Sequence, residues 1–424
     1  MHRTANRPGR TNSPRGRNNS FSTRSSGGRR PYNNRGGSGR PHGRGGRGGG
    51  GGRKIATFDP SRFINTNPVA LTQEVYKSTN TFDTFGLDSR IVNVIKGLGI
   101  TAPTPIQDQI IPEIMAGHDV IGLAETGTGK TAAFLAPLIH KTISEDQRQT
   151  LVLTPTRELA VQIEGELRKL GRGLGMHSTI CIGGVGIQGQ IHGLRRKNQF
   201  IIGTPGRVLD LINRGILKAN RVTTVVLDEA DRMLDMGFIH DIRLILDATP
   251  TDRETLFFSA TMTDAAEGLV NDFLRSPKTI SVKKKAVTDS IEQDVVPYTH
   301  NSKFETLVDL VKSPDFKRVL VFGSMKHSVE KLSRQLSQQG VRAESIHGNK
   351  SHGQRQRALS NFKRGNARVL VATDVAARGI HVDDVTHVIN YDLPTTFEDY
   401  VHRIGRTGRG DKRGKALTFI PSHH

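Results

Sequence analysis

The sequence predicts an α/β fold made of two tandem, doubly wound parallel-sheet domains. From about Phe82 onward, short apolar runs recur, and each ends in Gly, Pro, Thr, Ser or Asp before a stretch with a helical pattern. Continuous apolar strands that alternate with helices are typical of a parallel sheet covered on both faces. A chain of 424 residues has room for two such domains and a tail.

Each apolar run is expected to form one strand. Residues 82–275 form the first predicted domain, whose runs are 119-DVIGLA, 150-TLVLTP, 199-QFIIGTP, 223-TTVVLDEAD and 255-TLFFSAT. The polar stretch 276–290 interrupts the alternation and is interpreted as an interdomain linker. Residues 291–424 form the second predicted domain, whose runs are 318-RVLVFGS, 343-AESIHG, 368-RVLVATD, 386-THVINYD and 415-KALTFI.

The N-terminal segment differs sharply in composition from the rest of the chain. Residues 1–54 hold 14 Lys or Arg residues and no acidic residue, which is two thirds of the net charge of +21. Arg, Gly, Asn and Ser bury too little apolar surface to order a chain, so this basic tail is predicted to be disordered. Residues 55–81 are interpreted as an N-terminal extension between the tail and the first domain.

The tail favours a polyanionic partner, because basic groups that neutralise phosphates release counterions. Glycine lets such a segment follow an irregular strand, and arginine stacks on bases. A tail that only aids solubility and a mitochondrial transit peptide are alternatives, although the glycine run 48–52 would spoil an amphipathic helix. Arg-Gly-Gly occurs at Arg35, Arg44 and Arg47, with Phe21 and Tyr32 interleaved.

Composition also limits the cellular compartment in which the protein is expected. Cys181 is the only cysteine, so no internal disulfide framework exists and a reducing compartment is expected. The sequence has no apolar run long enough to span a membrane and no apolar core of a secretory signal near its start. We therefore expect a cytoplasmic protein without a membrane partner.

The segment 124-AETGTGKT-131 has the pattern of a phosphate-binding loop. Gly127 and Gly129 allow backbone N–H groups to converge on phosphate oxygens. Lys130 supplies positive charge to the phosphates, and the Thr131 hydroxyl is a magnesium ligand in such loops. The apolar run before the loop and the predicted helix after it provide the context that this function requires.

The segment 228-DEAD-231 follows another apolar run and completes the predicted nucleotide site. Asp228 is placed to hold Mg²⁺, usually through water, and Glu229 to polarise the attacking water as general base. Taken alone, these residues would more often form a solvated acidic turn. Together with the upstream phosphate loop they indicate a second half of a magnesium–nucleotide site.

These motifs resemble motifs I and II of the DEAD-box ATP-dependent RNA helicases of superfamily 2. The resemblance covers roughly residues 82–420 and implies two RecA-like domains that close on ATP and RNA. It continues through 103-PTPIQ-107, 155-PTRELA-160, 204-TPGR-207, 259-SAT-261, 372-ATDVAARGI-380 and 402-HRIGRTGR-409.

The resemblance implies a site for ATP and Mg²⁺ shared by both domains. Gln107 matches the residue that reads adenine, and Phe82 matches an aromatic that stacks on it, although a core role beside Phe85 is the alternative. Arg406 and Arg409 match arginine fingers that reach the γ-phosphate from domain 2. The loop residues that would contact the nucleotide are Ala124, Glu125, Thr126, Gly127, Thr128, Gly129, Lys130 and Thr131.

The resemblance also implies an RNA surface and a coupling element. Hydroxyl, glycine N–H and arginine groups suit phosphate contacts, which cannot read bases, whereas 2′-hydroxyl contacts would favour RNA over DNA. Ser259 and Thr261 would bond Asp231 and so link the nucleotide state to the grip on RNA. The matching RNA-binding positions are Pro155, Thr156, Arg157, Gly183, Gly184, Thr204, Arg207 and Thr373.

Three positions depart from the family pattern. His381 stands where the family commonly has an Asp that contacts the ribose, and a neutral imidazole accepts a hydrogen bond but carries no negative charge. His352 replaces the Gln of Gln-x-x-Arg, and Asp411 follows motif VI where glycine is usual. The hypothesis is that ATP affinity or coupling is weakened and not lost, since Lys130 and Glu229 are present.

The sequence therefore predicts an RNA-stimulated ATPase that separates short RNA duplexes on closing and hydrolyses ATP to release RNA. An ATP-dependent RNA clamp or scaffold with poor turnover is the first alternative, and a DNA translocase is the second. A monomeric core is expected, because one chain completes the site. Ribonucleoprotein or ribosome-assembly partners fit the family, but the sequence does not identify them or the natural RNA.

Overall fold

The computed structural model describes residues 63–65, 76–125, 127–145, 148–282, 291–299, 301–377, 382, 384–408 and 414–422. The predicted basic tail, residues 1–54, lies outside this part of the chain. The same is true of three predicted site residues, Thr126, His381 and Arg409, and of Asp411.

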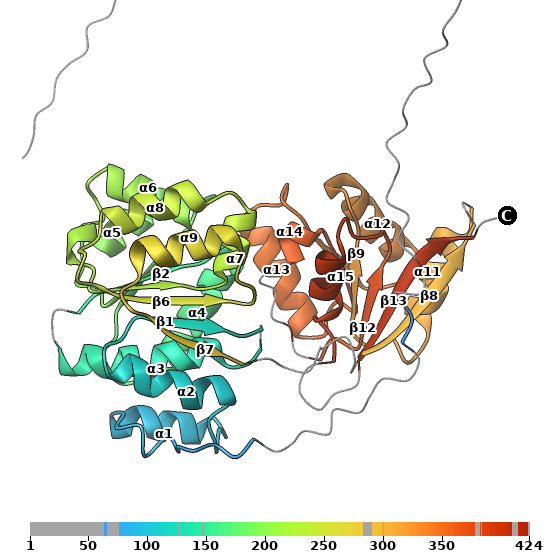
Figure 1. Ribbon diagram of the computed structural model, residues 1–424. Helices are drawn as coiled ribbons and strands as arrows, with labels where there is room; N and C mark the ends of the chain where they lie inside the picture. Colours follow the sequence, from blue (N-terminus) through green and yellow to red (C-terminus); the bar gives the residue numbers. More distant parts are fainter. Residues whose placement is uncertain are drawn as a thin grey trace, which may run out of the picture. The chain divides into compact units, whose positions relative to one another are not determined.

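The first domain is built on a seven-stranded sheet in the order β3-β4-β2-β5-β6-β1-β7, with every pair parallel (Figure 1). Its strands are β1 (Val120–Leu123), β2 (Thr150–Leu153), β3 (Ser178–Cys181), β4 (Phe200–Gly203), β5 (Thr224–Leu227), β6 (Glu254–Ser259) and β7 (Lys278–Ser281). Its helices are α1 (Ser89–Gly97), α2 (Pro105–Met115), α3 (Lys130–Ser144), α4 (Arg157–Leu170), α5 (Ile187–Leu194), α6 (Pro205–Asn213), α7 (Ala230–Asp235), α8 (Ile239–Asp247) and α9 (Asp264–Phe273), with a 3₁₀ turn, η2 (Ala219–Arg221).

Two apolar cores sandwich this sheet, because successive side chains along a strand point to opposite faces. Val152 packs into the core formed with α2, α3 and α4, whereas its neighbours Leu151 and Leu153 pack into the core formed with α6, α8 and α9. Both faces are therefore buried, which is why the sequence shows continuous apolar runs at these strands. The predicted doubly wound sheet is confirmed for this domain.

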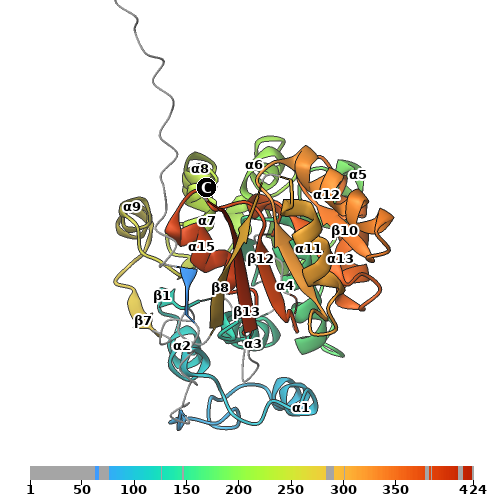
Figure 2. The ribbon, with the colours of Figure 1, turned by 90° about the vertical axis from the view of Figure 1, so that its right-hand side faces the viewer.

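The second domain has a six-stranded parallel sheet in the order β10-β11-β9-β12-β13-β8, and Figure 2 shows β12, β13 and β8 side by side. Its strands are β8 (Ile291–Tyr298), β9 (Val319–Phe322), β10 (Ala343–Ile346), β11 (Val369–Ala372), β12 (His387–Asn390) and β13 (Gly414–Pro421). Its helices are α11 (Lys303–Lys312), α12 (Lys326–Gln338), α13 (His352–Lys363), α14 (Asp374–Ala377) and α15 (Phe397–Ile404).

The structure shortens the predicted linker. Residues 276–290 were expected to connect the domains, but Lys278–Ser281 is the edge strand β7, which pairs in parallel with β1. Only Ile280 of this strand is buried, so the apolar signal of a strand is missing from the sequence. The connection between the two sheets is thus reduced to the residues between β7 and β8.

A short piece of the predicted N-terminal extension belongs to the second sheet. Asn65 forms an antiparallel bridge with Gln293 of β8, and Phe63 is buried with a relative exposure of 1%. The blue segment beside β8 in Figure 2 is this piece. Within the part of the chain that the structure describes, no helix is long and apolar enough to cross a membrane.

Candidate nucleotide and RNA site

The phosphate loop connects the end of β1 to the start of α3. Gly127 and Gly129 have φ values of 85° and 93°, a region that favours glycine, and they turn the chain into the helix. The buried Lys130 side chain lies inside the loop, where its ammonium donates to the carbonyl oxygen of Ala124 over 2.6 Å. A helix N-terminus with a lysine enclosed by the loop is suited to bind phosphate oxygens.

Gln107 links the loop to the preceding helix α2. Its side-chain oxygen accepts from the Thr104 N–H over 3.0 Å, and its amide nitrogen donates to the Gly129 carbonyl over 3.1 Å. The carboxamide is therefore placed at the phosphate loop by two hydrogen bonds. Adenine reading by Gln107 stays a prediction.

Phe82 lies in the core of the first domain. Its ring is 5.9 Å from that of Phe85 in an edge-to-face contact, and its relative exposure is 4%. This environment fits the alternative of a core aromatic better than an open stacking platform. Adenine stacking by Phe82 also stays a prediction.

The acidic segment begins where β5 ends, in the neighbourhood of the phosphate loop. Asp228 is buried, and desolvation raises the pKa of its carboxyl to about 6, although the charge of Lys130 opposes that rise. Glu229 has a φ of 54°, which is strained for a residue with a Cβ. Its Oε2 accepts from the Arg232 guanidinium over 2.7 Å, and both side chains are buried.

These carboxylates fit a divalent cation. A buried Asp228 carboxyl gains most from a nearby positive charge, and Oε1 of Glu229 is a buried acceptor without a hydrogen-bond partner. Among the described residues no group of three potential metal ligands occurs, so the protein would supply few of them. That arrangement suits Mg²⁺, which usually keeps waters and binds substrate phosphates.

The structure joins the acidic segment to the predicted coupling residues. Asp231 Oδ2 accepts from the backbone N–H groups of Ala260 and Thr261 over 3.0 and 3.1 Å and from the Thr261 hydroxyl over 3.3 Å. The Ser259 hydroxyl accepts from the Asp231 N–H over 3.3 Å. A shift of the acidic segment would therefore pull directly on the loop that follows β6.

Strand order places the predicted nucleotide and RNA residues along one edge of the first sheet. The nucleotide residues follow β1 and β5, and the coupling residues follow β6 between them. The predicted RNA residues follow β2, β4 and β3, which continue the same sheet beyond β5. Carboxyl ends of parallel strands share one edge, which is where open α/β sheets bind ligands.

Arg157 and the glycine pair after β3 meet on this edge. Gly184 has a φ of 74°, and a Cβ added there would collide with the Arg157 guanidinium. The sequence places these residues on different segments, and the structure brings them into contact. Thr156 caps the N-terminus of α4 by accepting from the Leu159 N–H over 3.3 Å.

Replacing Gly184 by Ala should weaken RNA binding by roughly tenfold or more, about the value of one charge-assisted contact. The new methyl group would displace Arg157, and the backbone would be strained. Equilibrium binding to single-stranded RNA checks this. Gly186→Ala is the matched control, since Gly186 has a φ of −55° and open space around it. Equal losses in both variants would contradict the prediction.

The remaining predicted RNA residues lie at starts of helices. Thr204 is the N-cap residue of α6, and Thr373 is buried directly before α14. Arg207 lies in the first turn of α6, where its Nη1 is buried without a hydrogen-bond partner. An unpaired guanidinium nitrogen is suited to a phosphate oxygen.

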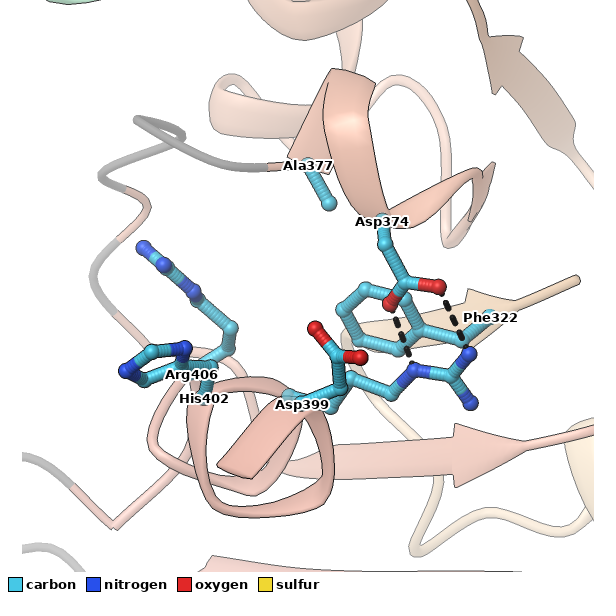
Figure 3. A pocket seen from close by; sticks show the side chains of 7 residues that line it. Phe322, Asp374, Ala377, Asp399, His402 and Arg406 are labelled. Carbon is cyan, nitrogen blue, oxygen red and sulfur yellow. Dashed lines mark hydrogen bonds and ion pairs between the residues drawn. The ribbon is translucent and has the colours of Figure 1, made fainter. Parts of the chain in front are cut away.

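Motif VI lies on α15 and the turn that follows it. Figure 3 shows a pocket where Arg406 and His402 lie on one side and Asp374 on the other. Asp374 accepts two hydrogen bonds from Arg403, of 2.6 and 2.8 Å, and the Arg403 guanidinium lies 5.0 Å from the Phe322 ring centroid. Arg403 is thus held within domain 2. Arg406 is also buried and lines the pocket, and its finger role stays a prediction.

His352, which departs from the family pattern, is the first residue of α13. Burial lowers the pKa of His352, and its Nδ1 is buried without a hydrogen-bond partner. One turn later, Arg355 forms a 2.9 Å ion pair with Glu158 of α4. The Arg of the family's Gln-x-x-Arg therefore has a carboxylate partner here, while the histidine leaves a polar nitrogen unsatisfied.

Several of these contacts involve residues that the sequence analysis missed. Arg232 follows Glu229 by three positions on a helix, a spacing that is a usable signal for an ion pair. The other pairs join distant segments, so no local pattern indicates them. They are Arg403 with Asp374 and Arg355 with Glu158.

Fold and site together define a two-domain, P-loop enzyme that acts on nucleic acid. Family models match both domains, DEAD/DEAH box helicase over residues 104–269 and helicase conserved C-terminal domain over residues 302–411. The ATP-dependent RNA helicase CshA of Listeria monocytogenes is 48% identical over 80% of this chain and 66% of its own length. The corresponding protein of Bacillus subtilis is 46% identical over 81% and 70%.

The chain therefore belongs to the DEAD-box family of ATP-dependent RNA helicases, and it spans about two thirds of the length of these curated relatives. Two solved structures are similar to this chain. S. cerevisiae Dbp5 bound to RNA and ADP BeF3 is 29% identical with a TM-score of 0.72, covering 81% of this chain and 90% of that one. Mss116p bound to ssRNA and AMP-PNP is 29% identical with a TM-score of 0.73, covering 82% and 76%.

Proposed function

We propose that this helicase grips single-stranded RNA by its backbone, separates short duplexes as its domains close on ATP, and hydrolyses ATP to release RNA. The observation that supports this proposal is the strand order β3-β4-β2-β5-β6-β1, because the phosphate loop, the acidic segment and the RNA positions predicted in domain 1 all follow strands of this series. Bound ATP can then influence the binding of RNA, and the reverse, through the short segments that follow these strands. A relative, Dbp5, binds RNA together with ADP BeF3.

Each catalytic residue has a distinct role in this proposal. Lys130 neutralises charge on the β- and γ-phosphates, and Glu229 orients and deprotonates the attacking water. Mg²⁺, when bound, supplies charge stabilisation at the phosphates, with Thr131 and Asp228 as its protein ligands. Arg406 and Arg409 would stabilise the charge that develops at phosphoryl transfer.

The Asp231 contacts supply the coupling. Because Asp231 holds the segment Ala260–Thr261 through three hydrogen bonds, ATP binding and RNA binding should reinforce each other. The RNA residues would contact phosphates and 2′-hydroxyls, so recognition would be largely independent of base sequence. Helix α6, which begins beside Arg207, would bend the bound strand so that a duplex partner leaves.

Steady-state ATP hydrolysis with and without single-stranded RNA tests the proposal. We expect strong stimulation by RNA and little by DNA, together with separation of a short duplex that needs ATP. RNA binding without stimulated turnover would favour the alternative, an RNA clamp, which the histidines at positions 381 and 352 keep open. In that case His381→Asp and His352→Gln would be the first reversions to make.

Deleting residues 1–54 should weaken RNA binding and reduce its salt dependence. The deleted tail carries 14 basic residues, and each neutralised phosphate of a single strand contributes about 0.7 to the slope of log affinity against log salt. Binding isotherms at several salt concentrations measure this. A full-length variant with those basic residues changed to Gln controls for chain length, and an unchanged slope in both would exclude a tether.

Location and assembly are also proposals. A cytoplasmic site is supported by the single cysteine, Cys181, which is buried and free. A monomeric core is proposed because both halves of the ATP site come from one chain. Size-exclusion chromatography with light scattering checks the oligomeric state.

A further inference from the structure

A three-residue segment of the N-terminal extension is docked on domain 2. The Phe63 ring is buried with a relative exposure of 1% and meets the Tyr400 ring edge-on at 4.7 Å. Asn65 donates its N–H to the Gln293 carbonyl over 2.8 Å and accepts from the Gln293 N–H over 2.9 Å. The segment thus pairs with β8 at one residue through an isolated antiparallel bridge, and one aromatic side chain of the segment is buried against domain 2.

The pocket for Phe63 is built from the same elements that position motif VI. Its apolar residues come from β8, β13 and α15. The Tyr400 hydroxyl, inside this cluster, donates to Gln293 Oε1 over 2.8 Å. Helix α15 also carries Arg403, and Arg406 lies two residues beyond the end of this helix. The residues around Phe63 are Ile291, Tyr400, Ile404 and Ala416.

A second piece of the extension is fixed to domain 1 beside the predicted adenine reader. The Asp108 carboxylate accepts from the Tyr76 hydroxyl over 2.7 Å and from the backbone N–H groups of Thr79 and Asn80 over 2.8 and 3.0 Å. Asp108 directly follows Gln107 in α2. The extension therefore has one attachment at each half of the proposed ATP site.

We propose that packing of the Phe63–Asn65 segment against β8, β13 and α15 positions the motif VI helix for the closed, RNA-bound state. Phe63 is thus a positioning residue that acts through α15, and it does not touch substrate. This inference rests on the proposed role of Arg406 at the γ-phosphate.

The occupant of this site is a segment of the same chain. Eleven peptide units connect Asn65 to Tyr76, and they span at most about 40 Å when fully extended, so one continuous extension can make both attachments only when the two sites lie within that distance. Between its neighbours, Ile64 is exposed at 47%, so the contact depends on Phe63 and on Asn65, whose side-chain amide also donates to the Ile291 carbonyl over 3.5 Å.

Full-length Phe63→Ala and Asn65→Pro test the proposal, with Ile64→Ala as the matched control. The proline removes the N–H that donates to Gln293 and the side-chain amide that donates to the Ile291 carbonyl, and it leaves the Phe63 side chain unchanged. Hydrogen exchange at the Gln293 amide reports docking, and RNA-stimulated ATP hydrolysis reports positioning. Phe63→Leu, which keeps an apolar side chain, should restore much of both.

We expect faster exchange at Gln293 in Phe63→Ala and Asn65→Pro, and an RNA concentration for half-maximal ATPase that rises roughly fivefold or more. Turnover at saturating RNA and ATP should stay close to that of Ile64→Ala. Unchanged exchange and an unchanged half-maximal RNA concentration in both variants would overturn the proposal. A fall in saturating turnover alone, with the half-maximal concentration unchanged, would also overturn it, since it indicates only a damaged domain 2.

An error in the proposed helicase function and an error in the positioning role of Phe63 would give different experimental results. If the proposed helicase function were wrong, the wild-type protein and Ile64→Ala would show no RNA-stimulated hydrolysis, while exchange at Gln293 would still report docking. If only the positioning role were wrong, stimulation would be present and equal in all variants.

Discussion

Glu229→Gln should lower the turnover number for ATP by about 10² to 10⁴, the usual contribution of a general base. The amide cannot accept the proton of the attacking water. ATP and RNA should still bind, because Lys130 and the RNA residues are unchanged. Since hydrolysis is proposed to release RNA, the variant should also hold RNA longer in the presence of ATP. Single-turnover hydrolysis and RNA dissociation measured on the same preparation check both effects.

Glutamine is the right replacement because Glu229 also has a structural partner. Its carboxylate is paired with the buried Arg232 guanidinium at 2.7 Å, and the Gln carbonyl oxygen can still accept that hydrogen bond. Glu229→Ala would instead leave Arg232 buried and unpaired, which costs about 3 to 5 kcal/mol. The Ala variant should therefore unfold at a lower temperature than the Gln variant. Residual turnover above one tenth of wild type in Glu229→Gln would place the general base elsewhere.

The alternation of strands and helices could be predicted because most strands are buried on both faces. Strand β2 (Thr150–Leu153) illustrates this, since each of its residues is buried and its sequence is apolar after the first position. The edge strands β7 and β8 carry no such signal. In β7 only Ile280 is buried, and β8 has exposed or half-buried positions along much of its length. These edges explain why the predicted linker was too long.

The candidate site could be predicted where function depends on a short motif at a strand end. Lys130, Asp228 and Asp231 are examples, and the structure brings them to one edge of the sheet. Their partners were harder to foresee, because an ion pair between distant segments depends on how the helices pack. The meeting of Arg157 with Gly184 and the docking of Phe63 on Tyr400 are of this kind. Such contacts arise from tertiary packing and leave no local pattern in the sequence.

Arg403→Gln should destabilise domain 2 by about 3 kcal/mol, because a half-buried carboxylate loses its partner and two further oxygen atoms lose a charged donor. Arg403 has a relative exposure of 2% and donates to both Asp374 carboxylate oxygens. It also donates to the Asp392 carbonyl over 2.6 Å and to the Asn390 side-chain oxygen over 3.3 Å. For a domain of this size the melting temperature should fall by about 10 °C or more, which thermal unfolding followed by circular dichroism measures.

Arg406→Gln is the matched control, since it removes the same charge three positions later in motif VI. If Arg406 is the finger, this variant should lose most ATP turnover. Arg403→Gln should keep most of its turnover at a temperature where it is folded. Adding Asp374→Asn to Arg403→Gln should recover part of the lost stability, because the second change removes the half-buried carboxylate that has lost its partner. A stable Arg403→Gln protein without ATPase activity would show that Arg403 itself is the finger. The roles of Arg403 and Arg406 would then be the opposite of those that the ion pair of Arg403 with Asp374 indicates.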